Sequence, residues 1–88
     1  MSITVVVKLK VGDRAKFEEV FASRASARAT AGLEINTYRD IDDPNGVVGI
    51  GTGPSKEAFF EFMTNPEQQE AMKTATVQGP PDITFLEA

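Results

Sequence analysis

The 88-residue sequence contains no cysteine, no histidine and no tryptophan. Without cysteine the chain can form no disulfide, no thiolate nucleophile and no cysteine metal site. Without histidine it can form neither a Ser-His-Asp triad nor a histidine-ligated haem, and most zinc sites are excluded. Positive charge is also scarce, because nine basic and thirteen acidic residues give a formal net charge of −4. This balance disfavours nucleic acid and anionic membrane surfaces as partners.

Long hydrophobic runs are missing as well. No stretch of consecutive apolar residues is longer than the three at Val5 to Val7, whereas a transmembrane helix needs about 20. The N-terminus shows no basic segment followed by an apolar run, so no signal peptide is expected. We therefore expect a cytoplasmic protein that does not associate with membranes.

The remaining composition is typical of one globular domain over residues 1–88, since 41% of the residues are hydrophobic and 25% are charged. A domain this short buries only about 60–65% of its unfolded surface. With no disulfide or metal to add stability, a second copy of the chain is the simplest source of additional core. Length and composition therefore favour a homodimer.

Alternating apolar residues predict four strands. Between the second and third strands, the segment Asp-Asp-Pro-Asn-Gly predicts a tight turn. Before the last strand, Gly79-Pro80-Pro81 is expected to break the chain. The predicted strands cover residues 3–11, 33–41, 47–52 and 83–86.

Helical spacing of apolar residues predicts helices after the first and third strands. Asp13 is expected to cap the first helix, which runs on to about Thr30. Ser55 is expected to cap the second helix. Asn65 then restarts that helix, with Gln68 as its partner in a capping box.

The order βαββαβ predicts a ferredoxin-like α+β fold, in which both helices cover one face of an antiparallel four-stranded sheet. The other face keeps apolar residues, because on the first strand either Val6 or the row from Ile3 to Leu9 must point there. An apolar sheet face is seldom left exposed on a monomer. Packing it against the same face of a second copy gives a dimeric α+β barrel with two-fold symmetry.

Two arginines on the first helix are candidate ligand-binding residues. Arg24 and Arg28 lie one turn apart beside the aromatic stripe that includes Phe21. They could form a cationic rim for an acidic or phenolate ligand. The alternative is a solvated helix edge, with the arginine stems lying over apolar surface. Phe21 and Phe59 are predicted to line the same ligand site.

Asn36 and Tyr38 are candidate catalytic residues that share one face of the second strand. If that face points to the helices, they offer an amide and a phenol to a cavity. If it points away, they are polar groups of the dimer interface. Tyr38 is the only tyrosine and so the only phenol available for acid–base chemistry. No metal site is predicted, because the acidic turn at 40–43 lacks the distal bidentate glutamate of a calcium loop.

The glycines at 49, 51 and 53 lead from a strand into a helix, as phosphate-binding loops do. Their spacing does not match the dinucleotide fingerprint, because Pro54 stands where the last glycine or alanine belongs and has no N–H to offer a phosphate. Gly49 and Gly51 instead point to one face of their strand. They leave a groove for a closely packed helix or a ligand.

Three segments resemble the antibiotic biosynthesis monooxygenase-like family of the dimeric α+β barrel superfamily. The stretch AGLEINTYRDIDDP at 31–44 is similar to that family's second strand and following turn. The stretch SKEAFFEF at 55–62, with Asn65-Pro66 and Met72, is similar to its second helix. The ending VQGPPDI at 77–83 is similar to that of small members.

The resemblance implies a homodimer with a pocket between sheet and helices in each subunit. It also implies oxygenation of polycyclic aromatic or quinol substrates without a cofactor, the substrate anion supplying the electrons to O₂. Asn36, Tyr38 and Arg39 match residue types at family positions. The chain departs from well-studied members in lacking tryptophan and histidine, and without histidine the haem-degrading branch is discounted.

Three functions are consistent with these observations. The first is a cofactor-independent monooxygenase acting on a small aromatic or quinone-like substrate. In it, Tyr38 or Asn36 holds the substrate oxygen. Arg24 or Arg28 favours its anion. The second is a non-catalytic ligand-binding or stress-related dimer of the same fold. The third is an isomerase or cyclase that uses Tyr38 or Glu34 as the base.

Overall fold

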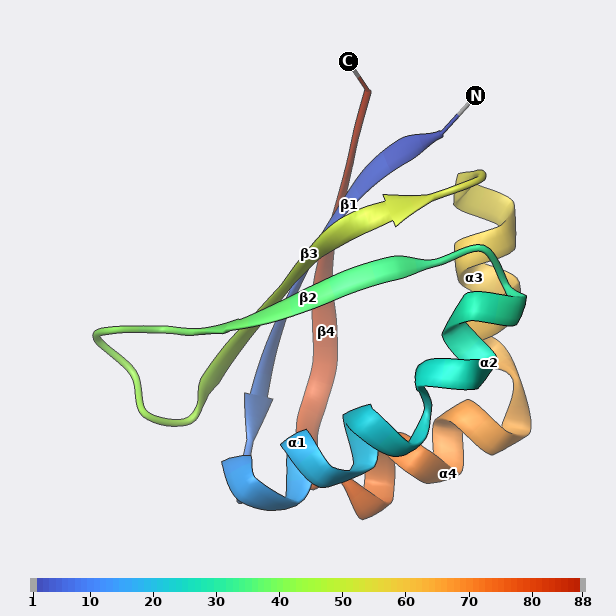
Figure 1. Cartoon of the computed structure of the whole chain (residues 1–88). Helices are drawn as coiled ribbons and strands as arrows, with labels where there is room; N and C mark the ends of the chain where they lie inside the picture. Colours follow the sequence, from blue (N-terminus) through green and yellow to red (C-terminus); the bar gives the residue numbers. More distant parts are fainter. Residues whose placement is uncertain (1, 88) are drawn as a thin grey trace.

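The four strands form one antiparallel sheet in the spatial order β2-β3-β1-β4, and all the helices pack on one of its faces (Figure 1). The structure, a computed structural model, describes residues 2–87. The predicted ferredoxin-like α+β fold is confirmed. Its elements are β1 (Ile3–Val11), α1 (Arg14–Ser23), α2 (Ala25–Thr30), β2 (Glu34–Arg39), β3 (Gly46–Gly53), α3 (Lys56–Thr64), α4 (Pro66–Thr74) and β4 (Val77–Leu86).

The three predicted N-cap residues are confirmed, whereas the predicted capping box is not. Asp13, Ser55 and Asn65 each accept a hydrogen bond from a backbone N–H in the first turn of the helix that follows. The capping box at Gln68 is wrong. The Gln68 side-chain oxygen instead accepts a hydrogen bond from Arg24 Nε, at 3.0 Å, because the break between α1 and α2 brings that arginine across to α4.

The single helix predicted up to Thr30 is also wrong, since the chain leaves helical geometry at Arg24 (φ −98°, ψ 7°). The Ser23 hydroxyl donates to the Val20 carbonyl at 2.6 Å. That carbonyl would otherwise accept the Arg24 N–H in a continuous helix, and this N–H bonds to the Phe21 carbonyl instead. The hydroxyl of Ser23 thus occupies a carbonyl of the last turn of α1, a contact that favours bending of a helix at this point.

The last strand is longer than predicted, because Gly79-Pro80-Pro81 lies inside β4 and does not precede it. Proline is tolerated there because β4 is an edge strand and pairs on one side only. The pairing of β4 with β1 shifts register between Lys8 and Lys10. Gly79 adopts a positive φ of 70°, which suits such an irregularity.

Alternate residues of the strands face the helices and form the core. On β1 these are the odd-numbered residues, of which Val5, Val7 and Val11 are buried. Opposite them on β3, Gly49 and Gly51 have no side chain, so β2 approaches closely. A Cβ placed on Gly51 would lie 2.6 Å from the Ile35 Cα, which is closer than real side chains come. The buried hydrophobic residues are Val5, Val7, Val11, Phe17, Leu33, Val47, Phe59 and Ala75.

The opposite sheet face, which we call the open face, carries an apolar centre with charged margins. Tyr38 is 54% exposed, Ile50 41% and Leu86 48%. Val6 pairs with Ile50, and Val48 pairs with Tyr38, which makes the apolar strip continuous across β2, β3 and β1. The charged residues of this face are Lys8 and Lys10 on β1, Glu34 on β2 and Asp82 on β4. None of the helices within residues 2–87 has the length and apolar character needed to cross a membrane.

Candidate functional site

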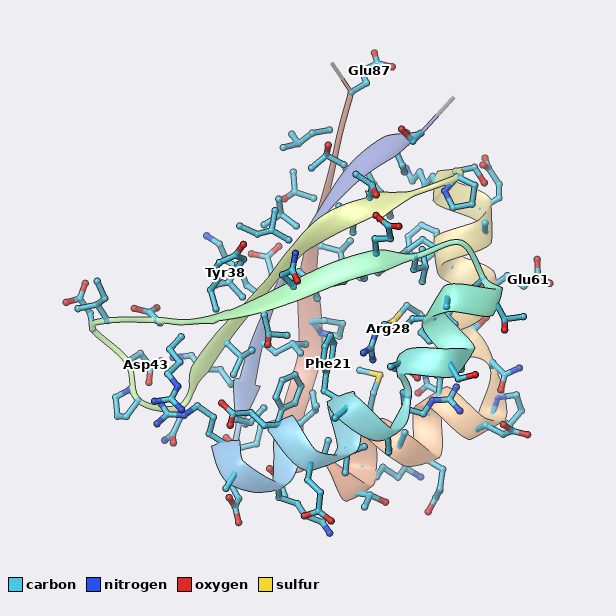
Figure 2. The ribbon with its side chains drawn as sticks, viewed as in Figure 1. Phe21, Arg28, Tyr38, Asp43, Glu61 and Glu87 are labelled. Carbon is cyan, nitrogen blue, oxygen red and sulfur yellow. The ribbon has the colours of Figure 1, made fainter. Side chains whose placement is uncertain are left out.

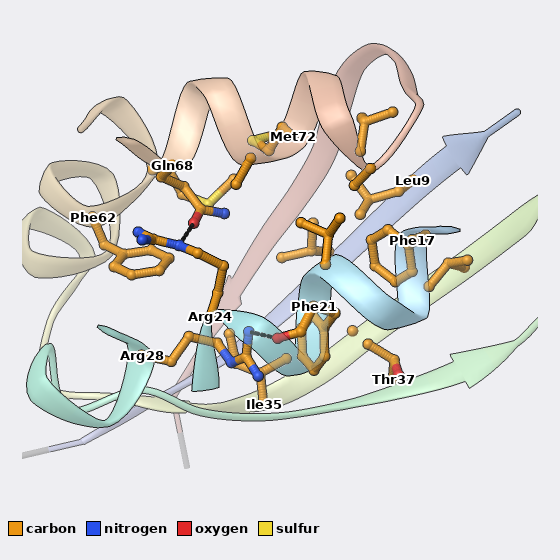
Figure 3. Close-up of a pocket in the computed structure, with 18 of the residues that line it drawn as sticks. Leu9, Phe17, Phe21, Arg24, Arg28, Ile35, Thr37, Phe62, Gln68 and Met72 are labelled. Carbon is orange, nitrogen blue, oxygen red and sulfur yellow. Dashed lines mark hydrogen bonds between the residues drawn. The ribbon is translucent and has the colours of Figure 1, made fainter. Parts of the chain in front are cut away.

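A cavity lies between the sheet and the helical layer (Figure 3). Its floor is formed by β1, β2 and β3, and its roof by α1, α3 and α4. About 80 Å³ of it is open to the centres of water-sized molecules. At about 10–15 Å³ for each water centre, that is room for roughly six waters, or a ligand about the size of one aromatic ring. The lining is apolar except for the side chains of Arg24, Arg28, Thr37 and Gln68.

Arg28 enters the cavity wall from α2 and is held there by Phe21 of α1. Its guanidinium carbon lies 3.5 Å from the centre of the Phe21 ring. Its Nη1 donates to the Phe21 carbonyl oxygen at 2.7 Å (Figure 3). A guanidinium has five N–H donors, and this is the one hydrogen bond that its side chain makes within residues 2–87.

Arg24 lies at the break between α1 and α2, and its side chain contacts residues at the start of α4. Besides the bond to Gln68, its guanidinium is 3.6 Å from a Glu67 carboxylate oxygen and 5.7 Å from the centre of the Phe62 ring. Glu67 is mostly exposed, so this ion pair is worth little on its own. The hydrogen bond and the ring contact fix the direction of the Arg24 side chain.

The positive charge of Arg28 has no acidic partner within residues 2–87, and no acidic residue lines the cavity. Burial lowers the pKa of the Arg28 guanidinium, and the nearby positive charge of Arg24 lowers it further. Both effects disfavour the charged form, and arginine nevertheless stays protonated. The cavity therefore joins an apolar body to one cationic end, which suits an anionic group on an apolar ligand.

The four residues predicted to bind a ligand lie together. Arg24, Arg28, Phe21 and Phe59 all line the cavity, and Phe59 is almost completely buried. The break at Arg24 leaves both arginines directed at the same space. Whether they bind a ligand stays a prediction.

Asn36 and Tyr38, predicted as catalytic, lie on the open face and do not line the cavity. Tyr38 is on the other side of the sheet from Arg28 and Phe21 (Figure 2). Of the two alternatives for this strand, the structure shows the second, in which Asn36 and Tyr38 point away from the helices. The exposed Glu34, the other candidate base, shares that face. Catalytic roles for these residues stay predictions.

Several further residues line the cavity that the sequence pattern did not mark as ligand-binding. Ile35 and Thr37 of β2 face it because they alternate with Asn36 and Tyr38. The alternation alone does not say which face is inward, and the only available signal was the aliphatic side chain of Ile35. Met63, Met72 and Gln68 also line it. Within residues 2–87 no group of three or more acidic side chains is placed to hold a metal ion.

Comparison with solved structures gives a consistent answer about the fold. A protein provisionally named an antibiotic biosynthesis monooxygenase from Bordetella bronchiseptica superposes with a TM-score of 0.82 at 19% identity, over 99% of this chain and 96% of that one. SnoaB, a cofactor-independent oxygenase from Streptomyces nogalater, superposes with a TM-score of 0.77 at 24% identity, over 99% of this chain and 92% of that one. A further protein provisionally named an antibiotic biosynthesis monooxygenase, from Caulobacter crescentus CB15, superposes with a TM-score of 0.75 at 25% identity, over 99% of this chain and 89% of that one.

The chain has the fold of the antibiotic biosynthesis monooxygenase-like proteins. The resemblance seen in the sequence is therefore confirmed for the fold. No protein-family model matches the chain, and no curated protein matches it. The structural similarity extends over nearly the whole of both chains, so the strands and helices that form the cavity lie within the superposed part.

Proposed function

We propose that the protein is a homodimeric monooxygenase that needs no cofactor and acts on a small, electron-rich aromatic substrate. The observation that carries this proposal is the apolar, ring-sized cavity with two arginines at one end. SnoaB, which shares the fold, is a cofactor-independent oxygenase. The cavity contains no histidine, cysteine or acidic side chain, so the reaction must depend on the reactivity of the substrate.

The two arginines supply the electrostatic part of this chemistry. A phenol bound beside Arg24 and Arg28 would ionise more readily, because nearby positive charge stabilises the phenolate. The phenolate can then give electrons to O₂. For a dihydroxybenzene the balanced reaction with one O₂ gives a hydroxyquinone and one water. One oxygen atom forms the new C–O bond, the other leaves as water, and all four electrons come from the substrate.

The size of the cavity limits the substrate. About 80 Å³ of accessible space suits a single ring, whereas the resemblance implied polycyclic substrates. A larger substrate would have to displace the Arg24 side chain from Gln68 and Phe62. We therefore place single-ring phenols and quinols first among the candidates.

The open face supports the homodimer in this proposal. Its apolar strip is exposed in one chain, and Lys8, which pairs with Val48 on one side and Asp82 on the other, borders that strip. Two such faces packed together would bury Tyr38, Ile50 and Leu86 in a two-fold interface. In this dimer Asn36 and Tyr38 belong to the interface.

Incorporation of labelled oxygen tests the enzymatic part. The protein is incubated with dihydroxybenzenes under ¹⁸O₂, and oxygen uptake and product mass are followed. We expect one ¹⁸O atom in the quinone and no hydrogen peroxide. Spontaneous autoxidation instead produces hydrogen peroxide and no label in the ring. Loss of all enzyme-dependent label would leave the second candidate, a non-catalytic ligand-binding dimer, which the absence of an acid–base group in the cavity favours.

A further inference from the structure

We infer that the natural ligand of the cavity carries a carboxylate on its ring, and that Arg28 binds this carboxylate. The inference rests on the proposed small-molecule site and names its chemical class. The structural basis is a difference in polar partners between the two arginines. The Arg24 guanidinium contacts the side chains of Gln68 and Glu67, whereas the Arg28 guanidinium makes one hydrogen bond, to a backbone carbonyl.

The geometry around Arg28 leaves one edge of its guanidinium unused. The Phe21 ring covers one face of the group at 3.5 Å, and the Phe21 carbonyl takes one N–H. The remaining donors have no partner within residues 2–87. A carboxylate can bind two parallel N–H groups of a guanidinium, whereas a phenolate has one oxygen. The unused donors therefore match a carboxylate better than a phenolate.

The surroundings favour an anion that is attached to an apolar body. Arg24 adds a second positive charge near Arg28. Exposed Glu67 pairs with Arg24 from outside the cavity, and among residues 2–87 no acid lines the cavity or pairs with Arg28. The rest of the wall, including Phe17, Val47 and Met72, is apolar. A bare inorganic anion would leave this apolar space unfilled, and a neutral ring would leave the charge of Arg28 uncompensated.

Binding of benzoate and benzamide tests the inference without any turnover. The two probes have nearly the same shape and differ in charge. We expect the protein to bind benzoate at least tenfold more tightly than benzamide, measured by NMR titration at fixed ionic strength. Equal affinities would overturn the inference and leave Arg28 a packing role on Phe21.

Variants of Arg28 locate the effect. Arg28→Met should lower benzoate affinity at least tenfold and leave benzamide affinity within about twofold. Arg28→Lys keeps the charge without the planar fork and should fall between the two. Arg14→Met is the matched control, because Arg14 bonds to the Pro44 carbonyl outside the cavity. If Arg28→Met fails to fold, the benzoate to benzamide ratio of the unaltered protein and Arg28→Lys still decide the question.

Oxygen uptake separates this inference from the proposed function. We expect 2,5-dihydroxybenzoate to be oxygenated at least tenfold more efficiently, in kcat/KM, than hydroquinone. Selective benzoate binding with no oxygenation would support the inference of a carboxylate ligand and exclude the proposed monooxygenase activity. Oxygenation of both substrates with equal efficiency would support the proposed monooxygenase activity and overturn the inference of a carboxylate ligand.

Discussion

Arg28 and Phe21 form a closed pair in which the guanidinium stacks on the ring at 3.5 Å and donates to the carbonyl of the same residue at 2.7 Å. The pair spans the break between α1 and α2, since one partner lies on each side of it. It therefore holds the shorter helix against the longer one and sets the direction of the charge in the cavity. The stability of α2 and the position of the ligand site depend on the same contact.

Phe21→Leu should weaken that pair while keeping an apolar side chain. Loss of the ring removes both the cation–π contact with Arg28 and the stacking on Phe17, whose ring centre lies 5.8 Å away, and we expect a decrease in the free energy of unfolding of about 1–2 kcal/mol. Chemical denaturation measures the change. The matched variant is Val20→Leu, a neighbouring position of α1 that makes no contact of this kind. An equal decrease in both variants would contradict a specific role for the Arg28–Phe21 pair.

Phe59→Ala and Phe60→Ala form a matched pair on α3. Phe59 is 1% exposed and lines the cavity, whereas Phe60 is 42% exposed. Removing a buried phenylalanine costs about 3–5 kcal/mol, so we expect Phe59→Ala to be strongly destabilised. We expect Phe60→Ala to lose less than half as much, although its ring packs against Phe85. Thermal unfolding compares the two, and similar losses would show that the core is placed wrongly.

Gly51→Ala should be among the most damaging small substitutions. A Cβ at this position would meet the backbone of Ile35, which cannot rotate away as a side chain could. We expect a loss of about 3 kcal/mol, at the upper end for overpacking. Gly79→Ala is the control, because its Cβ would meet nothing within 4 Å and the cost comes from its positive φ alone, about 1–2 kcal/mol. A smaller effect at Gly51 than at Gly79 would contradict the close approach of β2 and β3.

Ile50→Asp should convert the proposed dimer to a monomer. Ile50 lies in the middle of the apolar strip of the open face, so a charge there would be buried unpaired in the interface. Sedimentation at micromolar concentration measures the outcome. Ile41→Asp provides the control, because Ile41 is 98% exposed in the turn after β2. A monomer before any substitution, or a dimer in Ile50→Asp, would exclude this interface.

Tyr38→Phe distinguishes a catalytic residue from an interface residue. If Tyr38 acts only at the interface, as its place on the open face indicates, the substitution should leave the rate of labelled-oxygen incorporation within about twofold. If the hydroxyl transfers a proton, the rate should fall by about 10²-fold or more. The variant must first be shown to have the same oligomeric state as the unaltered protein.

The strand and helix pattern was largely readable from the sequence because it depends on local signals. The signals for these elements involve residues that are near one another in the sequence. They are the alternation from Ile3 to Val11 and the helix caps at Asp13, Ser55 and Asn65. The break at Arg24 was not readable, since it depends on a serine hydroxyl taking one carbonyl. The extension of β4 through two prolines depends on its position at the edge of the sheet, which only the assembled sheet defines.

The candidate site was readable in part. Arg24, Arg28 and Phe21 are close in sequence, and their helical spacing predicted that they face the same side. The helix breaks at Arg24, and all three side chains nevertheless line the cavity. The inward face of β2 was ambiguous, because Ile35 with Thr37 and Asn36 with Tyr38 make equally regular rows. The direction of Gln68 toward Arg24 depends on how α4 packs on α1, and that packing has no local signature.

The glycine at position 49 gives the cavity a bare backbone floor. A Cβ there would stand 3.2 Å from the Cγ2 methyl of Ile35, so that side chain would have to shift by a few tenths of an ångström, and the added methyl would occupy ligand space. A single added carbon atom at this position would thus reduce the volume of the site without removing either arginine. Selectivity for ligand size and selectivity for ligand charge are therefore separable, and relatives with this architecture could change one and retain the other.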